Sequence, residues 1–134
     1  MKIKISPLDR LFSQFIRLRA MKRVGGCERC LTSKNDIQKE DGSILSAWQQ
    51  LDCAHFHGRG SQSVRHDEDN AIGACGACHM YLDSHPVEKV EFFRQGLGQE
   101  RFDMLQCRAR TPAKYIDKVA IGLYLKLKIS ELEK

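Results

Sequence analysis

The sequence predicts an α+β fold, in which a small core of two strands and a helix is braced by a four-cysteine metal site and flanked by helices. Two Cys-x-x-Cys pairs, at residues 27–30 and 75–78, stand on either side of an inserted segment. Short apolar runs inside that segment are typical of strands, and apolar residues at helical spacing precede and follow it. With 134 residues the chain has the length of one domain, which we expect to extend over residues 1–134.

The composition leans towards a polyanionic partner. The chain has 22 basic and 17 acidic residues, a net charge of +5 and a pI of about 9.0. Such a surplus is typical of proteins that bind nucleic acid, although it also serves ordinary solubility. No run approaches the ~18 apolar residues of a membrane helix, and residues 1–10 lack the apolar segment of a signal peptide. We therefore expect a cytoplasmic protein with reduced thiols and no membrane partner.

A basic helix is predicted for residues 6–24. Ser6 is a favourable N-cap and Pro7 suits the first turn. The helix should end before the glycine pair at 25–26. Its basic side is either a solvated face or a face that contacts DNA. The candidate DNA-binding residues on this helix are Arg17, Arg19, Lys22 and Arg23.

The two cysteine pairs are predicted to bind one structural Zn²⁺ together. Zinc prefers a tetrahedron of thiolates or imidazoles, and each Cys-x-x-Cys turn can present two sulfurs. The sequence CGACH at 75–79 also matches a c-type haem attachment site, and either pair could be a redox dithiol. Because structural zinc contributes folding free energy directly, the metal would join the first helix to the second pair. The zinc ligands would be Cys27, Cys30, Cys75 and Cys78.

The zinc-braced core is expected over residues 27–85. Residues 44–56 have the character of a strand, residues 57–69 that of an ordered loop, and residues 70–74 that of a second short strand. A short helix should begin near Cys78.

The remaining part, residues 86–134, is predicted to be helical. Pro86 should open a helix that stops at Gly96, and residues 99–107 form a second. A long final helix should run over residues 112–132, capped by Thr111, and this helix could mediate a homodimer. Its apolar side chains are expected in the core or an interface, namely Tyr115, Ile116, Val119, Leu123 and Leu127.

Three residues of the core resemble the motif of the HNH, or ββα-metal, nucleases: His55 ends a strand, Asn70 starts the next, and His79 opens a helix. In that family two strands and a helix hold one divalent cation against a scissile phosphate. A cation offsets the charge that develops on phosphate, and a histidine can take a proton from water at neutral pH. The resemblance implies that His55 is the general base and Asn70 an orienting residue or metal ligand. It implies that His79 and Asp83 bind catalytic Mg²⁺ or Mn²⁺.

One position departs from that motif. Many HNH nucleases place Asp or His immediately before the general base, where this chain has Ala54. Glu68, His57 and Asp52 are candidates to complete the ligand set. Strand alternation puts His57 on the same side as His55 and Asp52 on the other, which favours His57.

A wider resemblance covers roughly residues 8–130. The segments DRLFSQFIRLRAMKRVGGCERCLT (9–32), AHFHGRGSQSVRHDEDNAIGACGAC (54–78) and PVEKVEFFRQGLGQERFDML (86–105) resemble the NinG (Rap) recombination proteins of phage lambda. The resemblance implies a phage-encoded, metal-dependent endonuclease that acts in the host cytoplasm. Its substrates would be branched recombination intermediates such as D-loops and Holliday junctions.

Two further arginines are candidate phosphate ligands. Arg59 and Arg65 lie between the motif strands, where they could clamp phosphates or instead form salt bridges with the acidic residues at 67–69. Phosphate contacts position DNA without reading its sequence, which suits an enzyme that recognises shape. A catalytically weak or inactive, zinc-stabilised DNA-binding protein is the alternative, and Ala54 favours it.

Overall fold

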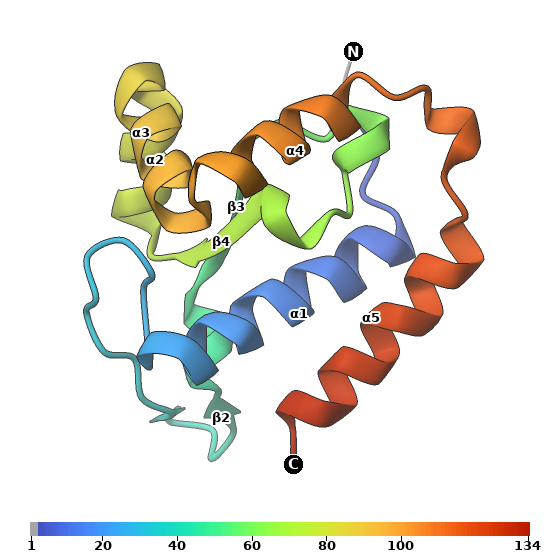
Figure 1. The fold of residues 1–134 in the computed structure, drawn as a ribbon. Coiled ribbons are helices and arrows are strands. Elements are labelled where there is room, and N and C mark those ends of the chain that lie inside the picture. Colours follow the sequence, from blue (N-terminus) through green and yellow to red (C-terminus); the bar gives the residue numbers. More distant parts are fainter. Residues whose placement is uncertain (1–2) are drawn as a thin grey trace.

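The computed structural model describes residues 3–134, which form an α+β architecture of five α-helices and two small antiparallel sheets. Helix α1 (Pro7–Val24) runs through the middle of the molecule, between α5 (Lys118–Leu132) and the sheet of β3 (Asp52–His55) and β4 (Ala71–Ala74) (Figure 1). The other sheet pairs β1 (Ile37–Gln38) with β2 (Ile44–Leu45).

Helix α1 is confirmed by its own local signals. The hydroxyl of Ser6 accepts a hydrogen bond from the Asp9 N–H at 3.1 Å, and the Asp9 carboxylate accepts one from the Ser6 N–H at 2.7 Å. This reciprocal capping box satisfies two N–H groups that a helix start leaves free. The helix ends at Gly25, whose φ of +70° favours glycine.

The predicted strand over residues 44–56 is wrong in its middle. A 3₁₀ turn, η1 (Ala47–Gln50), separates β2 from β3. Ser46 and Gln49 form a capping sequence, in which the Gln49 side chain accepts the Ser46 N–H at 2.9 Å. The strand predicted at 70–74 is present as β4 but begins one residue later, because Asn70 ends a 3₁₀ turn, η3 (Glu68–Asn70). Strand β4 pairs with β3 in the register Asp52↔Ala74 and His55↔Ala71.

The two faces of the β3–β4 sheet pack against different partners. Cys53 and Ala71 point to the side of α1 and α5. Ala54 and Ile72 point to the opposite side, which contains α2 (Gly76–Ser84), α3 (Pro86–Leu97) and α4 (Gln99–Ala109). This alternation decides which side chains of β3 can meet α2.

Glycine permits the close approach of α1 to the sheet. A Cβ at Gly73 would lie 2.5 Å from the Cβ of Ala20. Both positions are small, so the helix rests directly on β4 and fixes the end of α1 beside the second cysteine pair.

The C-terminal helices begin and end close to the predicted places, with one exception. The final helix begins at Lys118, not at 112, because the Asp117 side chain caps it by accepting the Ala120 N–H at 3.0 Å. A separate 3₁₀ turn, η4 (Ala113–Tyr115), precedes it. The buried residues of α5 are Leu125 and Ile129. Of the positions predicted for the core or an interface, Ile116 is half-buried and the other four are exposed, namely Tyr115, Val119, Leu123 and Leu127.

The remaining helix boundaries differ by one or two residues. Helix α2 begins at Gly76, two residues before Cys78, and α3 continues through Gly96 to Leu97. None of the helices within residues 3–134 combines the length and the apolar character that a bilayer crossing requires.

Candidate functional site

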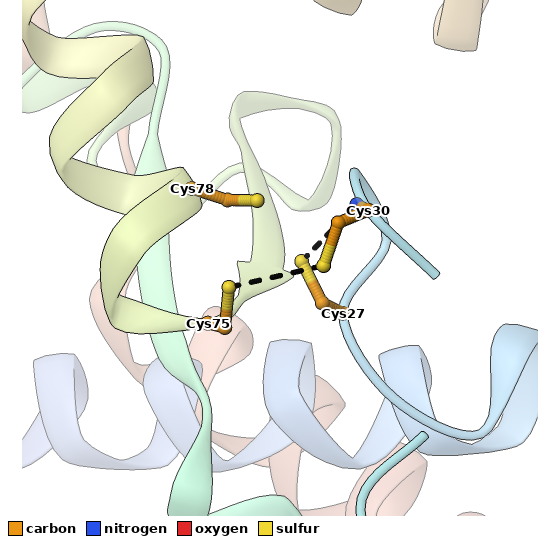
Figure 2. A group of neighbouring side chains, drawn as sticks. All are labelled: Cys27, Cys30, Cys75 and Cys78. Carbon is orange, nitrogen blue, oxygen red and sulfur yellow. Dashed lines mark hydrogen bonds between the residues drawn. The ribbon is translucent and has the colours of Figure 1, made fainter. Parts of the chain in front are cut away.

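The four cysteines predicted to bind zinc come together at one point. Cys27 and Cys30 lie on the turn that follows α1, while Cys75 is the N-cap of α2 and Cys78 lies in its first turn (Figure 2). Their sulfur atoms all lie within 4.8 Å of one another. The cluster can therefore hold a metal ion such as zinc, and it joins the end of α1 to the start of α2.

The spacing and surroundings of the sulfurs fit a thiolate-bound metal. Zinc–sulfur bonds of about 2.3 Å place the corners of a tetrahedron about 3.8 Å apart, and Cys30 Sγ lies 3.9 Å from Cys75 Sγ. Hydrogen bonding with Thr32 lowers the pKa of Cys30 to about 6, whereas burial raises the pKa of Cys78 to about 12. Arg29 Nη1 donates to Cys78 Sγ at 3.4 Å, which favours the thiolate that a metal requires.

A small hollow lies where β3 meets the start of α2. Its volume is about 330 Å³. On its α2 side, His79 Nδ1 lies 3.0 Å from Asp52 Oδ2, and His79 Nε2 lies 3.4 Å from Asp83 Oδ2. Helix α2 therefore presents the sequence-predicted pair of His79 and Asp83 next to the cysteine cluster. The lining residues are Ser13, Arg17, Leu51, Asp52, Cys53, Arg59 and His79.

Two arginines give the hollow a positive wall. The Arg17 guanidinium lies 4.8 Å from the centre of the Trp48 ring, and Arg17 Nε donates to the Ser13 carbonyl at 3.1 Å. The Nε–H of Arg59 is buried and has no hydrogen-bond partner within residues 3–134. Because guanidinium groups suit contacts with phosphate, the hollow combines an imidazole–carboxylate group with two candidate phosphate ligands.

The acidic side chains approach opposite nitrogens of the His79 ring. Among the described residues, the four cysteines form the one group of three or more candidate ligands whose donor atoms all converge. A divalent cation at the hollow would therefore be held either by Asp52 together with Nδ1 of His79 or by Asp83 together with Nε2 of His79. Water and phosphate oxygens suit the remaining positions, since Mg²⁺ commonly keeps several waters.

His55 lies at the end of β3, on the face opposite to α2. Its ring centre is 5.6 Å from that of Phe12 on α1, and the side chain is half-buried. Burial, followed by the positive charge of Arg59, lowers the pKa of His55 to about 4. The imidazole is consequently neutral at pH 7, and it lies outside the lining of the hollow.

Asn70 is fully buried, and its side chain forms hydrogen bonds with main-chain groups of the loop after β3. Its Oδ1 accepts the His57 N–H at 2.8 Å, and its Nδ2 donates to the carbonyls of His57 at 2.9 Å and Val64 at 3.1 Å. The Phe56 N–H also donates to the Asn70 carbonyl at 2.8 Å. Asn70 therefore holds the loop that follows His55. Its amide oxygen is not available to a metal.

The other proposed ligands lie elsewhere. His57 Nε2 lies 2.7 Å from Gln106 Oε1 on α4, and the Glu68 carboxylate accepts a hydrogen bond from the Tyr124 hydroxyl at 3.0 Å. The structure therefore does not bring His57 or Glu68 to His79.

The predicted DNA-binding arginines divide into buried and accessible groups. Arg65 is buried, and its Nε and Nη2 donate to the two Asp9 carboxylate oxygens at 2.9 and 2.6 Å. Arg19 is also buried and donates to the carbonyls of Glu68 and Ala71, each at 2.8 Å. Neither guanidinium is exposed on the outer surface of the fold, because each neutralises or supports groups inside it. The half-buried or exposed basic candidates are Arg17, Lys22, Arg23 and Arg59.

Sequence reasoning preferred His57 to Asp52, whereas the structure brings Asp52 to His79. The apolar residue Ala54, two positions after Asp52, indicates which side of β3 faces α2. Ala54 belongs to the same buried cluster as Leu82 of α2, and Asp52, two residues earlier, shares that side of the strand. Deciding which face of β3 meets α2, and not which face carries His55, identifies this residue.

In comparisons with protein-family models, curated proteins and solved structures, no match to this chain is found. The functional assignment therefore rests on the residues and on the arrangement described above.

Proposed function

We propose that the protein is a metal-dependent endonuclease of the HNH type that hydrolyses phosphodiester bonds in DNA. The observation that carries the proposal is the hollow, in which the His79–Asp52 pair faces Arg17 and Arg59 beside the four-cysteine cluster. Phosphodiester hydrolysis needs a cation site and positive groups that hold the anionic substrate, and this hollow offers candidates for both.

Arg17 and Arg59 would bind phosphate oxygens on the DNA strand. Stacking on Trp48 restricts the Arg17 side chain and leaves its terminal nitrogens free to donate. The unpartnered Nε–H of Arg59 would gain an acceptor when a phosphate enters. Both contacts are independent of base identity, which suits a shape-reading enzyme.

The residues around His79 would hold the catalytic cation. Mg²⁺ or Mn²⁺ bound there would polarise the phosphate and stabilise the leaving oxygen. Asp52 and Asp83 keep the ring of His79 in place from both sides, at 3.0 and 3.4 Å. Zinc in the cysteine cluster would act through the fold, because it fixes the turn from which His79 projects.

His55 is the candidate general base. Its lowered pKa keeps the imidazole unprotonated at pH 7, which is the form that accepts a proton. Asn70 would act as a positioning residue, because its side chain fixes the main chain directly after His55. The resemblance to the NinG proteins extends the proposal to branched recombination intermediates, handled in the cytoplasm of a phage host, and to a homodimer that could cut two strands.

Cleavage assays test the proposal directly. The protein would be incubated with duplex, flap, D-loop and four-way-junction DNA in Mg²⁺ or Mn²⁺, and products would be resolved by strand on denaturing gels. We expect cutting of branched DNA, and a loss of about 10²–10⁴-fold in rate for His55→Ala. His57→Ala is the matched control, because His57 contacts α4 outside the hollow. If no substrate is cut with any metal, the enzyme proposal is wrong.

Two observations favour a second function, a zinc-stabilised DNA-binding protein with weak or no catalysis. Ala54 occupies the strand position where HNH nucleases carry a ligand, and His55 packs against Phe12 away from the hollow. This alternative predicts DNA binding that weakens steeply with salt, without strand cutting and with zinc as the only tightly held metal.

A further inference from the structure

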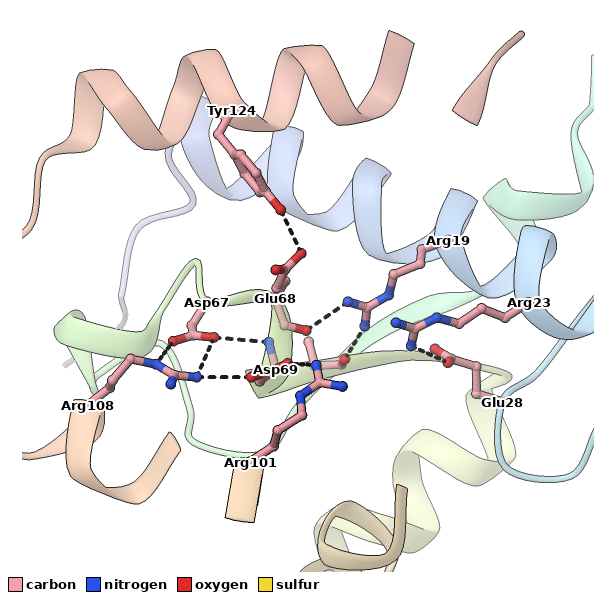
Figure 3. A network of polar contacts seen from close by, with 10 residues as sticks. Arg19, Arg23, Glu28, Asp67, Glu68, Asp69, Arg101, Arg108 and Tyr124 are labelled. Atoms are coloured by element: carbon pink, nitrogen blue, oxygen red, sulfur yellow. Dashed lines mark hydrogen bonds and ion pairs between the residues drawn. The ribbon is translucent and has the colours of Figure 1, made fainter. Parts of the chain in front are cut away.

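A second pocket lies on the other side of α1 from Arg17, between α1, β4, α3 and α4. Its volume is about 240 Å³. Part of its lining is apolar, with side chains that include Ile72, Phe92 and Leu97, and the rest includes charged members of the network drawn in Figure 3. The charged lining residues are Arg19, Arg23 and Arg101 with Glu28, Glu68 and Asp69. The signs balance, so the interior has no net preference for an ion.

Arg19 lines this pocket and contains a buried hydrogen-bond donor that is unused. Its Nη1 and Nη2 donate to main-chain carbonyls, but its Nε–H has no partner in the part of the chain that the structure describes. Arg19 is only 9% exposed. A buried donor without an acceptor is costly, and a ligand with a polar edge would supply the acceptor.

Two arginines of the pocket remain partly accessible. Arg23 lies 3.3 Å from the Glu28 carboxylate with 49% of its side chain exposed, and Arg101 pairs with Asp69 with 57% exposed. Their carboxylate partners are largely buried, with 10% of the Glu28 side chain and 13% of the Asp69 side chain exposed. The exposed part of each guanidinium can therefore meet an incoming anion while its ion pair is kept.

We propose that this pocket binds an unpaired nucleobase together with its flanking phosphate. A nucleobase has flat apolar faces, which suit the half-buried ring of Phe92, and an edge of acceptors and donors, which suits Arg19 and the carboxylates. Its phosphate would meet Arg23 and Arg101. A nucleotide in a strand combines a neutral base with an anionic phosphate. The balanced charges inside the pocket suit the base, and the exposed arginine side chains suit the phosphate.

Such a site would let the protein distinguish branched from fully paired DNA. Branch points, flaps and displaced strands offer bases that are already unstacked, whereas a duplex must pay to expose one. This inference rests on the proposed DNA substrate but not on cleavage, because base capture occurs in the binding step.

Gly96 allows the pocket to be filled without disturbing the fold. It lies in the lining on α3, and a Cβ added there meets no other heavy atom within 4 Å. Replacing glycine inside a helix improves helix propensity. Gly96→Leu should therefore add a bulky side chain at the lining of the pocket, and Gly96→Ala, which adds a single methyl group, is the matched control.

The test measures the affinity of wild type and both variants for flap DNA and for duplex DNA of equal length, by fluorescence anisotropy without added Mg²⁺ or Mn²⁺. Loss of one aromatic–base stack corresponds to about tenfold in affinity. We expect Gly96→Leu to bind the flap about tenfold more weakly and the duplex unchanged, with Gly96→Ala like wild type. A 2-aminopurine base in the flap should change its emission on binding wild type but not Gly96→Leu.

Equal flap binding by Gly96→Leu and wild type would overturn the pocket proposal, as would an equal loss on flap and duplex. Selective flap binding without cutting under any metal would uphold the pocket and remove the endonuclease. The two proposals therefore fail separately.

Discussion

The four-cysteine cluster and the hollow around His79 share the first turns of α2, yet they are built in opposite ways. In the cluster, four donors point at one another and two of them, Cys27 and Cys78, are buried. In the hollow, the side chains of His79, Asp52 and Asp83 are 31%, 51% and 54% exposed, and the carboxylates face different ring nitrogens.

The difference separates a site that builds the fold from a site that is left open for chemistry. Converging thiols would gain free energy from a bound metal, and the fold would then depend on that metal. Exposed and loosely paired groups contribute little to stability and remain free to bind a substrate. Variants of the cysteine cluster should therefore lose the fold, whereas variants of the hollow should keep the fold and lose activity.

The largest effect is expected for Cys27→Ser. Structural zinc contributes on the order of 10 kcal/mol in small domains, which is comparable to the usual free energy of unfolding of a whole domain, about 5–15 kcal/mol. The variant should lose its metal and be unfolded at 25 °C, as measured by metal analysis and circular dichroism. Cys107→Ser is the control, because Cys107 is exposed and lies outside the cluster. A folded Cys27→Ser protein with its full zinc content would show that the cluster is not the structural site.

A smaller loss is expected for Asn70→Ala, which removes the support of the loop after β3. Three main-chain groups of His57 and Val64 would lose their partners inside the protein. At about 1–3 kcal/mol for each unsatisfied group, the free energy of unfolding should fall by about 4 kcal/mol. Denaturant titration measures it, and the exposed Asn35→Ala serves as control. A change below 1 kcal/mol would mean that this loop is held by other contacts.

These two regions also show where sequence reasoning succeeds. The cysteine cluster and α1 follow from local rules: paired thiols at fixed spacing, a capping box at Ser6 and a glycine stop at Gly25. Each cap and each Cys-x-x-Cys spacing involves residues a few positions apart, so the sequence contains that signal directly. The two cysteine pairs lie far apart in the chain, and their joining follows from the four ligands that zinc requires. The turn that begins at Ser46 also has a local signal in the sequence, because its capping partner Gln49 lies three residues later. The strand prediction over residues 44–56 overlooks this signal.

The errors arise where a residue depends on a partner far along the chain. Arg65 was expected to meet the acids at 67–69 or DNA, and it instead pairs with Asp9, 56 residues away. Nothing near Arg65 in the sequence indicates that α1 will place a buried carboxylate beside it. Asp52 was passed over for the same reason, since its position relative to His79 depends on how α2 packs on the sheet.

A pH-dependent loss of stability is expected from His55, on the closed face of β3. Burial lowers the pKa of His55 to about 4, so below pH 6.5 the unfolded chain binds a proton that the folded chain does not. The free energy of unfolding should fall as the pH drops from 6.5 to 4, by on the order of 3 kcal/mol. His66, whose pKa burial also lowers, contributes in the same direction.

The variant His55→Gln should remove most of this slope, leaving the smaller part due to His66. Thermal or urea unfolding at several pH values between 7 and 4 gives the measurement, and the pH-7 stability of the variant provides its reference. If the pH dependence of the free energy of unfolding were the same in His55→Gln, His55 would have an ordinary pKa and an accessible side chain. It would then resemble the exposed residues of the hollow.

The smallest effect on folding, and the sharpest separation of the two sites, is expected for His79→Ala. The side chain is partly exposed and its pairs with Asp52 and Asp83 are surface contacts, so the free energy of unfolding should change by less than about 1 kcal/mol. DNA cleavage should nevertheless fall by about 10²-fold or more, since the residue would hold the catalytic cation. His85→Ala, an exposed histidine six residues further on, should alter neither quantity. If His79→Ala instead released zinc and unfolded as Cys27→Ser is expected to do, His79 would belong to the structural cluster, and the boundary drawn between Cys78 and His79 would be in the wrong place.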